Sequence, residues 1–460
     1  MKRSHLFFFT IIFICFITSC KKESFLTSAD ALLFTSVDTL HFDTIFTGAG
    51  SIIQSFKIYN PNDQKLLLSD VELAGGNNSF FKLNVDGAPG TSFNNIEIAP
   101  NDSIYVFVTV NINSGSANRP FLVEDSIRIN YNGNETLVLL DAYGQNAHFL
   151  RNISVTKDTL WTSELPFVLL GKFIVNEGKT LTITKGTKIY CHADAQFIVN
   201  GSLYISGEND GKVIFQGDRL DDYYKDLPGS WQGITFSRSS KNNMLNYTEL
   251  KNANRAIIVN EPATVNNPKL KLHQCIIDNA LEAGILCSNS SIEAINCLIY
   301  NCGNNINITA GGNYSFMHCT VVSYSNNFIA HVNPVLSISN SDSNNQTFAL
   351  SACFVNSIFY GDNGIVNDEI LVQQSGGSSF NVNFENVLYK ATDAIEANFT
   401  NCIQNADPLF VKIDIGKNQY DFHLQTESPC VNTGKNAFVS EDLDGHFRDS
   451  EPDIGCYELQ

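Results

Sequence analysis

The segments LHQCIIDNALEAGI (272–285), AINCLIYNCGNNI (294–306) and FMHCTVVSYSNNF (316–328) repeat one pattern with a period of 22 residues. Within each segment apolar residues alternate with polar ones, as in a β-strand, and no helical period of 3.6 residues runs through them. A fixed period in the twenties is typical of a solenoid, in which stacked repeats bury the apolar faces that one repeat cannot bury alone. The repeat therefore predicts a stack of short parallel strands.

The period also places similar residues at the same position of each turn of the stack. Parallel strands lie about 4.8 Å apart, so each side chain rests on its counterpart in the next turn. We expect three ladders, one of cysteine, one of aliphatic residues and one that is mainly asparagine: Cys275, Cys297 and Cys319; Ile277, Ile299 and Val321; Asn279 and Asn301, with Ser323 at the same position.

A coil of this length resembles the right-handed parallel β-helix of the pectin-lyase-like superfold. The glycine-bearing segment VNEGKTLTITKGTKIYC (175–191) is similar to the first coils of such proteins, and NADPLFV (405–411), SPCVNTGK (428–435) and DIGCYE (453–458) are similar to their closing segment. The resemblance implies a β-helix over residues 151–460, with a C-terminal cap at about 403–460. It implies no single activity, because this superfold carries lyases, hydrolases, adhesins and binding modules.

The ladder cysteines are expected to be free thiols. Side chains one strand apart would hold their Cβ atoms about 4.8 Å from each other, whereas disulfides prefer roughly 3.5–4.5 Å. We therefore interpret these cysteines as small buried apolar residues.

Residues 28–150 show a different pattern of alternating strands and turns, typical of an antiparallel sandwich. The stretch FDTIFTGAGSIIQSFKIYNPNDQKLLLSDVEL (42–73) resembles immunoglobulin-like modules of the ASPM/SPD-2/Hydin type. The expected fold class is therefore all-β: an N-terminal immunoglobulin-like β-sandwich followed by a right-handed parallel β-helix solenoid. The resemblance implies a spacer or adaptor, and the residues of this module indicate no site.

Residues 1–19 have the charge and hydrophobicity of an export signal, with Lys2 and Arg3 before a short apolar run. The run ends Ile17-Thr18-Ser19-Cys20, which resembles a bacterial lipobox. The resemblance implies cleavage before Cys20 and acyl chains on its sulfur and amine, with residues 20–27 as a linker. We expect a lipid-anchored protein of a Gram-negative cell envelope, at the outer membrane and facing either the periplasm or the surface.

The formal net charge of −18 argues against nucleic acid as a partner and, more weakly, against polyanionic substrates. A polysaccharide or another envelope protein remains as the expected partner, besides the membrane reached through the lipid.

The segment GDRLDDYYKDLPGSWQGITF (217–236) interrupts the solenoid pattern and could contact a glycan. Its aromatic side chains offer an apolar face with a polar group for stacking on sugars, and its carboxylates could act as general acid and base. The alternative is a solvated loop on the side of the helix, with Trp231 closing one turn. The candidate contacts are Asp218, Asp221, Asp222, Tyr223, Tyr224 and Trp231.

Two further groups carry charge. Asp442 and Asp444 resemble the opening of a calcium loop, but a third oxygen ligand and a closing Glu are missing, which favours a structural Asp-Gly turn. No other cofactor is predicted.

Lys251 and Arg255 could serve as the basic residues of a polysaccharide lyase, although charged side chains on a solvated turn are the simpler interpretation.

Two functions follow from these observations. The favoured one is a non-catalytic, lipid-anchored β-helix that binds a glycan or a protein or has a structural role, since no acid/base set falls on one turn and catalytic residues are not assigned. The alternative is a polysaccharide lyase or glycoside hydrolase that acts on the lateral face of the β-helix.

The lipid anchor is testable by substitution. Cys20→Ser removes the acylation site, and we expect the protein to lose incorporated fatty acid and to leave the membrane fraction, because two or more acyl chains are needed for stable anchoring. Metabolic labelling and cell fractionation measure both effects. Cys15→Ser, inside the apolar run, is the control that should stay acylated.

Overall fold

The computed structural model describes residues 24–460 except 48–49, 113–120, 222–223 and 263–266. Cys20 and the signal therefore lie outside the described residues. The regular secondary structure of the described chain consists of β-strands and two short 3-10 helices, η1 (Gly76–Asn78) and η2 (Ile415–Lys417). No helix in it is long and apolar enough to cross a membrane. It divides between Asn146 and Ala147 into two units.

The first unit is a β-sandwich. Alternate residues of its strands are buried, as in β9 (Asp102–Val110), and the inward side chains of both sheets form one core around Phe56, Phe81 and Val106. The all-β class is confirmed, whereas the immunoglobulin-like assignment stays a prediction. One sheet contains β1 (Phe25–Leu26), β5 (Lys65–Leu73), β10 (Phe121–Tyr131), β11 (Asn134–Gln145) and β3 (Thr39–Phe46), with β8 (Ser92–Ile98) beside β5. The other contains β2 (Phe34–Thr35), β4 (Gln54–Asn60), β9 (Asp102–Val110), β6 (Phe81–Val85) and β7 (Ala88–Gly90).

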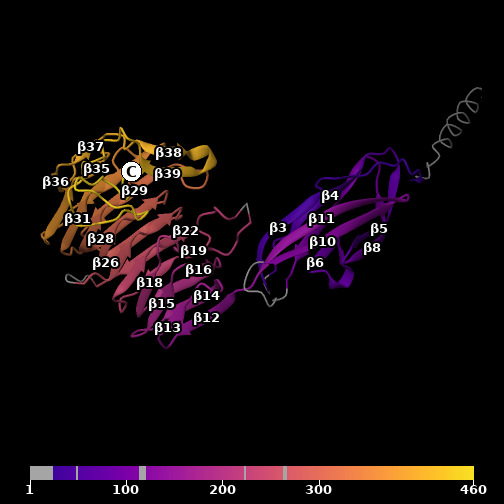
Figure 1. Cartoon of the computed structure of the whole chain (residues 1–460), viewed down its shortest axis with the longest axis horizontal. Helices are drawn as coiled ribbons and strands as arrows, with labels where there is room; N and C mark the ends of the chain where they lie inside the picture. Colours follow the sequence, from indigo (N-terminus) through magenta and orange to yellow (C-terminus); the bar gives the residue numbers. More distant parts are fainter. Residues whose placement is uncertain (1–23, 48–49, 113–120, 222–223, 263–266) are drawn as a thin grey trace, which may run out of the picture. The chain divides into compact units, whose positions relative to one another are not determined.

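The second unit is a parallel β-helix solenoid, which confirms the expected architecture. It opens with β12 (His148–Val155) and β14 (Phe167–Val175), and the following turns add parallel strands to three stacks (Figure 1). Two long strands, β26 (Ala283–Ile295) and β28 (Ile306–Met317), pass from the first stack into the second.

The first stack contains β17 (Gln196–Val199), β20 (Ile234–Phe236), β23 (Arg255–Asn260), β30 (Leu336–Ser339) and β33 (Ile370–Gln373). The second stack contains β13 (Thr159–Trp161), β15 (Thr180–Thr184), β18 (Ser202–Ser206), β21 (Asn243–Asn246), β24 (Leu270–His273), β31 (Leu350–Val355), β34 (Phe380–Glu385) and β36 (Asn398–Thr400). The third stack contains β16 (Lys188–Cys191), β19 (Val213–Gly217), β22 (Thr248–Lys251), β25 (Ile276–Asp278), β27 (Leu298–Tyr300), β29 (Thr320–Tyr324), β32 (Ile358–Asp362), β35 (Leu388–Tyr389) and β37 (Ile403–Gln404).

The cysteine ladder is confirmed. Ile276 pairs with Leu298 and Leu298 with Thr320, so the three preceding cysteines occupy the same position on successive turns. All three are free and fully buried, and burial raises the pKa of the Cys297 and Cys319 thiols. They behave as small apolar side chains at the bend between the second and third stacks.

The asparagine ladder is confirmed and extends one turn further. Asn252, Asn279 and Asn301 have φ angles of 59°, 53° and 52°, in the left-handed region that asparagine tolerates better than most residues. Asn279 Nδ2 donates to Asn252 Oδ1 at 2.7 Å. The ladder therefore ends each strand of this part of the third stack and links one turn to the next.

Aromatic rings stack along the core in the same way. Phe354 lies between Phe316 and Phe384, with ring centroids 5.4 and 4.8 Å away, and Phe399 lies 4.8 Å beyond Phe384. Each ring thus fills the space between two turns.

The C-terminal segment lies along the side of the solenoid. Its hairpin of β38 (Phe410–Asp414) and β39 (Gln419–Leu424) and the chain after it form a second apolar cluster with the outward residues of the third stack, including Leu298, Ile358 and Leu388. Cys456 N donates to Thr320 Oγ1 at 3.0 Å. The C-terminal residues, which were expected to cap the last turn, therefore contact several successive turns. They cover apolar side chains on the outer face of the third stack that would otherwise be exposed to water.

The phenylalanine stack gives a test of the core. Phe354→Ala should lower the free energy of unfolding by about 3–5 kcal/mol, because it leaves a cavity between two fixed rings. Tryptophan fluorescence in a denaturant titration reports on this unit, since both tryptophans, Trp161 and Trp231, are buried in its core. Asn381→Ala, an exposed position on the next strand, should change the midpoint little.

Candidate functional site

The carboxylates of the 217–236 segment are largely engaged by neighbouring side chains. Asp218 Oδ2 lies 2.7 Å from His192 Nδ1, and Arg219 Nε donates to Asp221 Oδ2 at 3.1 Å. The Arg219 guanidinium also lies over the Tyr224 ring, 3.8 Å from its centroid. These contacts hold the segment to itself and, through His192, to the chain that follows β16. Two other candidates, Asp222 and Tyr223, lie outside the described residues.

Trp231 belongs to the core, so its expected role as a glycan contact is wrong. Its side chain is fully buried, its ring stacks on Phe215 with centroids 6.1 Å apart, and its Nε1 donates to the Lys251 carbonyl at 2.8 Å. A sugar ring has no exposed indole face to stack on. The alternative, in which Trp231 completes a turn of the helix, agrees with this position.

Asp442 and Asp444 form part of a turn held by hydrogen bonds. Asp442 is fully buried, and its Oδ1 accepts from the backbone of Asp444 at 2.9 Å and of His446 at 2.8 Å. Asp444 Oδ2 lies 3.0 Å from His423 Nε2. These bonds match the structural Asp-Gly turn, and no group of three or more His, Cys, Asp or Glu side chains in the described parts of the chain is placed to hold a metal.

The basic pair also has acidic partners. Lys251 Nζ lies 2.7 Å from Glu249 Oε1, and Arg255 is paired with Glu282. Lys251, however, lies at the edge of a pocket that the sequence did not reveal.

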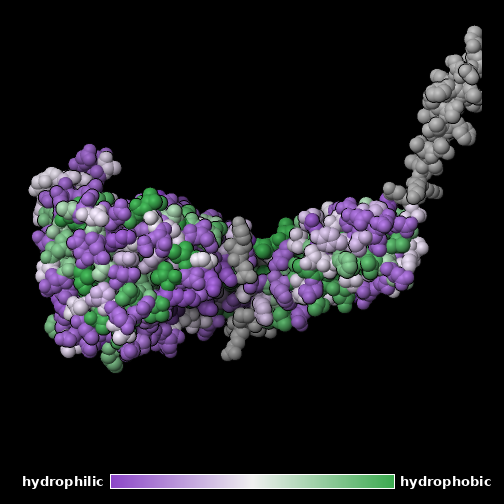
Figure 2. Space-filling view, turned by 90° about the horizontal axis from the view of Figure 1, so that it is seen from above, coloured by the Kyte–Doolittle hydropathy of each residue, from purple (hydrophilic) through white to green (hydrophobic). Residues whose placement is uncertain are grey.

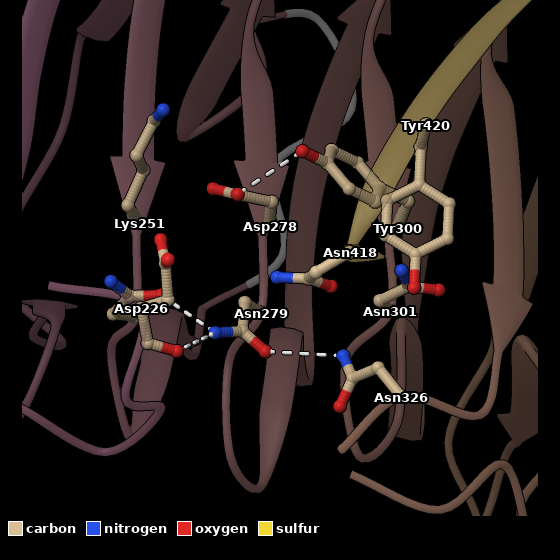
Figure 3. Close-up of a pocket in the computed structure, with 10 residues that line it drawn as sticks. Asp226, Lys251, Asp278, Asn279, Tyr300, Asn301, Asn326, Asn418 and Tyr420 are labelled. Atoms are coloured by element: carbon tan, nitrogen blue, oxygen red, sulfur yellow. Dashed lines mark hydrogen bonds between the residues drawn. The ribbon is translucent and has the colours of Figure 1, made fainter. Parts of the chain in front are cut away.

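This lateral pocket opens on the outer face of the third stack and measures about 170 Å³ (Figure 3). The strand register builds its wall, because Lys251 of β22 pairs with Asp278 of β25, which pairs with Tyr300 of β27. Other segments complete it: Asp226 comes from the 217–236 segment, Asn326 from the loop after β29, and Asn418 and Tyr420 from the C-terminal hairpin, while Asn252, Asn279 and Asn301 end the strands.

Hydrogen bonds fix the asparagines of the pocket. Asn279 Nδ2 donates to the carbonyl of Asp226 at 2.8 Å and to Asn252, and its Oδ1 accepts from Asn326 at 3.4 Å (Figure 3). Asn301 Oδ1 accepts from the backbone of Tyr324 at 2.8 Å. The amides are therefore pre-organised before any ligand arrives.

Asp278 has an unusual environment within this pocket. The Tyr300 hydroxyl donates to its Oδ2 at 3.1 Å, whereas its Oδ1 is enclosed and has no hydrogen-bond partner. Burial raises the pKa of Asp278 to about 7; Lys251 and the Tyr300 hydrogen bond oppose this rise, and the charges of Glu249 and Asp226 add to it. Near neutral pH this carboxyl group is therefore divided between its charged and neutral forms.

Two further polar atoms of the pocket remain unmatched. The Asn301 amide lies near the Tyr420 hydroxyl, but neither Asn301 Nδ2 nor the Tyr420 oxygen reaches hydrogen-bond geometry with a partner. An enclosed polar group without a partner costs roughly 1–3 kcal/mol. Three such atoms in one pocket indicate a place that a hydroxyl-bearing molecule or ordered water would stabilise.

A second pocket of about 620 Å³ lies on the other side of η2. Its lining combines tyrosine rings with acidic groups and includes Tyr324, Tyr360, Asp362, Asp407 and Asp414. The Tyr324 and Tyr420 rings lie 6.4 Å apart and are stacked, which places the two pockets on one face of the solenoid.

The sequence contained a signal for only part of the pocket, and the sequence analysis did not use it. Asp278 and Tyr300 share one position of the repeat, three residues after the ladder cysteine, and their polar character at an outward position was the available signal. Tyr420 and Asn418 carried no such signal, because only the fold brings the hairpin to the third stack.

No family model matches the chain, and no curated protein matches it significantly. Among solved structures, the catalytic unit of a GH87 α-1,3-glucanase from Streptomyces thermodiastaticus is 9% identical and covers 76% of this chain and 88% of its own, with a TM-score of 0.24. A family 123 glycoside hydrolase from Clostridium perfringens is 13% identical over 27% of this chain and 26% of its own (TM-score 0.19). The PapD-like domain 7 of human CEP192 is 12% identical over 28% and 94% (TM-score 0.17). Likenesses at these scores carry no argument about activity.

The His423 contacts predict a pH-dependent stability. Hydrogen bonds to Asp444 and Asp421, opposed by partial burial, raise the pKa of His423 to about 9. A raised pKa in the folded state stabilises the fold below the unfolded value of about 6.5, and this contribution is lost as the pH rises through about 9. His423→Asn should therefore lower the melting temperature at pH 6 and much less at pH 10. An equal loss at both values would contradict this assignment.

Proposed function

We propose that this protein is a lipid-anchored glycan-binding protein of the bacterial cell envelope, whose solenoid binds a neutral oligosaccharide at the lateral pocket. The observation that carries the proposal is the set of three enclosed, unmatched polar atoms in one pre-organised pocket: Asp278 Oδ1, Asn301 Nδ2 and the Tyr420 hydroxyl.

The unmatched atoms suit hydroxyl groups. Asn301 Nδ2 can only donate, Asp278 Oδ1 accepts when ionised and donates when it carries the proton, and the Tyr420 hydroxyl does both. A sugar hydroxyl also donates and accepts, so one sugar ring can satisfy groups of both kinds. The rings of Tyr300 and Tyr420 beside them provide the apolar surface that a sugar ring stacks on.

The size of the pocket limits what it encloses. Ligand pockets commonly measure about 300–1,000 Å³, so a cavity of about 170 Å³ holds only part of an oligosaccharide. The rest of the chain would lie on the surface, and the second pocket on the same face offers room for it.

Charge supports a neutral ligand. Asp226 and Asp278 line the lateral pocket, and Asp362, Asp407 and Asp414 line its neighbour. Lys251 is already paired with Glu249. A uronate chain would meet an excess of carboxylates on this face, as well as the net charge of −18.

The envelope location rests on the sequence. The signal at residues 1–19 and the lipobox-like Ile17-Thr18-Ser19-Cys20 support a lipid anchor at Cys20, and the strand-rich solenoid is an architecture that carries long lateral binding faces. An anchored solenoid of this kind would retain a glycan at the membrane, whether it faces the periplasm or the cell surface.

One observation favours the alternative of a glycoside hydrolase or polysaccharide lyase. A carboxyl with a pKa near 7 is suited to general acid catalysis, and Asp226 supplies a second carboxylate at the same pocket. The first stack offers fewer carboxyl groups for such catalysis. One register row along it contains no carboxylate and consists of Thr235, Ile258, Leu286, Asn307, Ser337 and Leu371. Release of reducing or unsaturated ends from a bound glycan would establish this alternative.

Binding is testable with the full-length chain in detergent against cellohexaose, maltohexaose, mannohexaose, polygalacturonate and chitosan oligosaccharides. We expect at least one neutral hexasaccharide to bind and polygalacturonate not to bind. Failure of all neutral glycans, with or without binding of a charged one, would overturn the proposal.

Tyr420→Phe tests the pocket itself. Loss of the hydroxyl should weaken binding of the neutral hexasaccharide about fivefold, because one hydrogen bond contributes roughly 1 kcal/mol. Isothermal titration calorimetry measures the change. Tyr204→Phe, an exposed tyrosine of β18 away from both pockets, is the matched control and should bind like the unmodified protein.

A further inference from the structure

The two oxygens of Asp278 have different surroundings. Oδ2 accepts the Tyr300 hydroxyl hydrogen at 3.1 Å, and Oδ1 is enclosed without a partner. When this carboxyl group binds a proton, the proton belongs on Oδ1, because Oδ2 then remains the carbonyl oxygen, which is the better acceptor for the Tyr300 hydroxyl. The neutral form of Asp278 therefore leaves the existing hydrogen bond intact.

The charged form is poorly compensated. Two other carboxylates, Glu249 and Asp226, act on Asp278, and the Lys251 ammonium that opposes them lies 2.7 Å from Glu249. The remaining polar groups around the pocket, including Tyr420 of β39 and the asparagines, are uncharged. An ionised Asp278 thus depends on the water that still reaches the pocket.

A bound neutral glycan would remove that water. A sugar contributes no positive charge, so the cost of keeping Asp278 ionised beside two carboxylates rises when the pocket is covered. A protonated Asp278 carries no such cost. A ligand with an amine would have the opposite effect, because its ammonium would compensate the ionised carboxylate.

We propose that glycan binding at the lateral pocket is linked to protonation of Asp278, so that the site takes up a proton with a neutral oligosaccharide and releases the oligosaccharide as the pH rises. This inference rests on the proposed function and adds to it a means of control by pH. Neutral glycans would bind more tightly at acid pH, and amino sugars would not share this dependence.

The test measures binding of the tightest-binding neutral hexasaccharide, among cellohexaose, maltohexaose and mannohexaose, to the full-length chain at pH 6 and pH 8. With a pKa of about 7 for the free protein, affinity should fall about tenfold over this interval if only the protonated form binds. Calorimetry at pH 7 in two buffers of different ionisation enthalpy should show net proton uptake.

Two variants separate titration of Asp278 from a structural role. Asp278→Asn mimics the protonated acid and should bind at pH 8 as tightly as the unmodified protein binds at pH 6, with no pH dependence. Tyr300→Phe removes a hydrogen bond that lowers the pKa of Asp278, so the loss of binding should move to higher pH. Asp210→Asn, at an exposed carboxylate outside both pockets, should keep the full dependence.

The outcomes distinguish the two proposals. Equal affinity at pH 6 and pH 8, tighter binding at pH 8, or a pH dependence that survives in Asp278→Asn would overturn the proton linkage and leave glycan binding in place. If no hexasaccharide binds at either pH, the proposed function fails and the linkage fails with it.

Discussion

The register between parallel strands is the constraint on which the rest of the solenoid depends. Each residue lies on its counterpart one turn away, so the side chains of a row share one environment. Cys275, Cys297 and Cys319 are all fully buried at the bend between the second and third stacks, and the stacked phenylalanines all lie in the core. A slip of one residue would turn the inward row of every strand toward solvent. The register thus fixes both the core and the outer face.

The same constraint divides the outer face of the third stack between two roles. In β27, Leu298 and Tyr300 both point outward while Ile299 points into the core. From Leu298 onward this row is apolar except for Thr320, and its apolar members pack against the C-terminal segment. The row through Tyr300 is polar on its early turns and forms the wall of the lateral pocket. Folding of the C-terminal segment onto one row therefore also encloses the pocket on the neighbouring row.

Enclosure is what changes the chemistry of Asp278. On an open sheet this carboxyl group would be hydrated and ionised at neutral pH. Beneath the hairpin and the 217–236 segment it loses water and gains the carboxylate of Asp226, in addition to that of Glu249 on the neighbouring strand β22, and its pKa rises to about 7. The chemical properties of the pocket therefore depend on several segments that meet only in the folded protein, and no single sequence motif encodes them. One fold can carry many different functions for this reason.

The amino-acid sequence by itself determined the all-β class, the period of the solenoid, and the cysteine and asparagine ladders, because these depend on residues that recur at fixed spacing and meet their own counterparts. It did not determine that Trp231 would be buried or that Asp278 would be enclosed. Tyr420 and Asn418 reach the pocket from more than a hundred residues beyond Tyr300. Burial and pKa depend on which distant segments cover a residue, so only the tertiary structure decided where the candidate site lies.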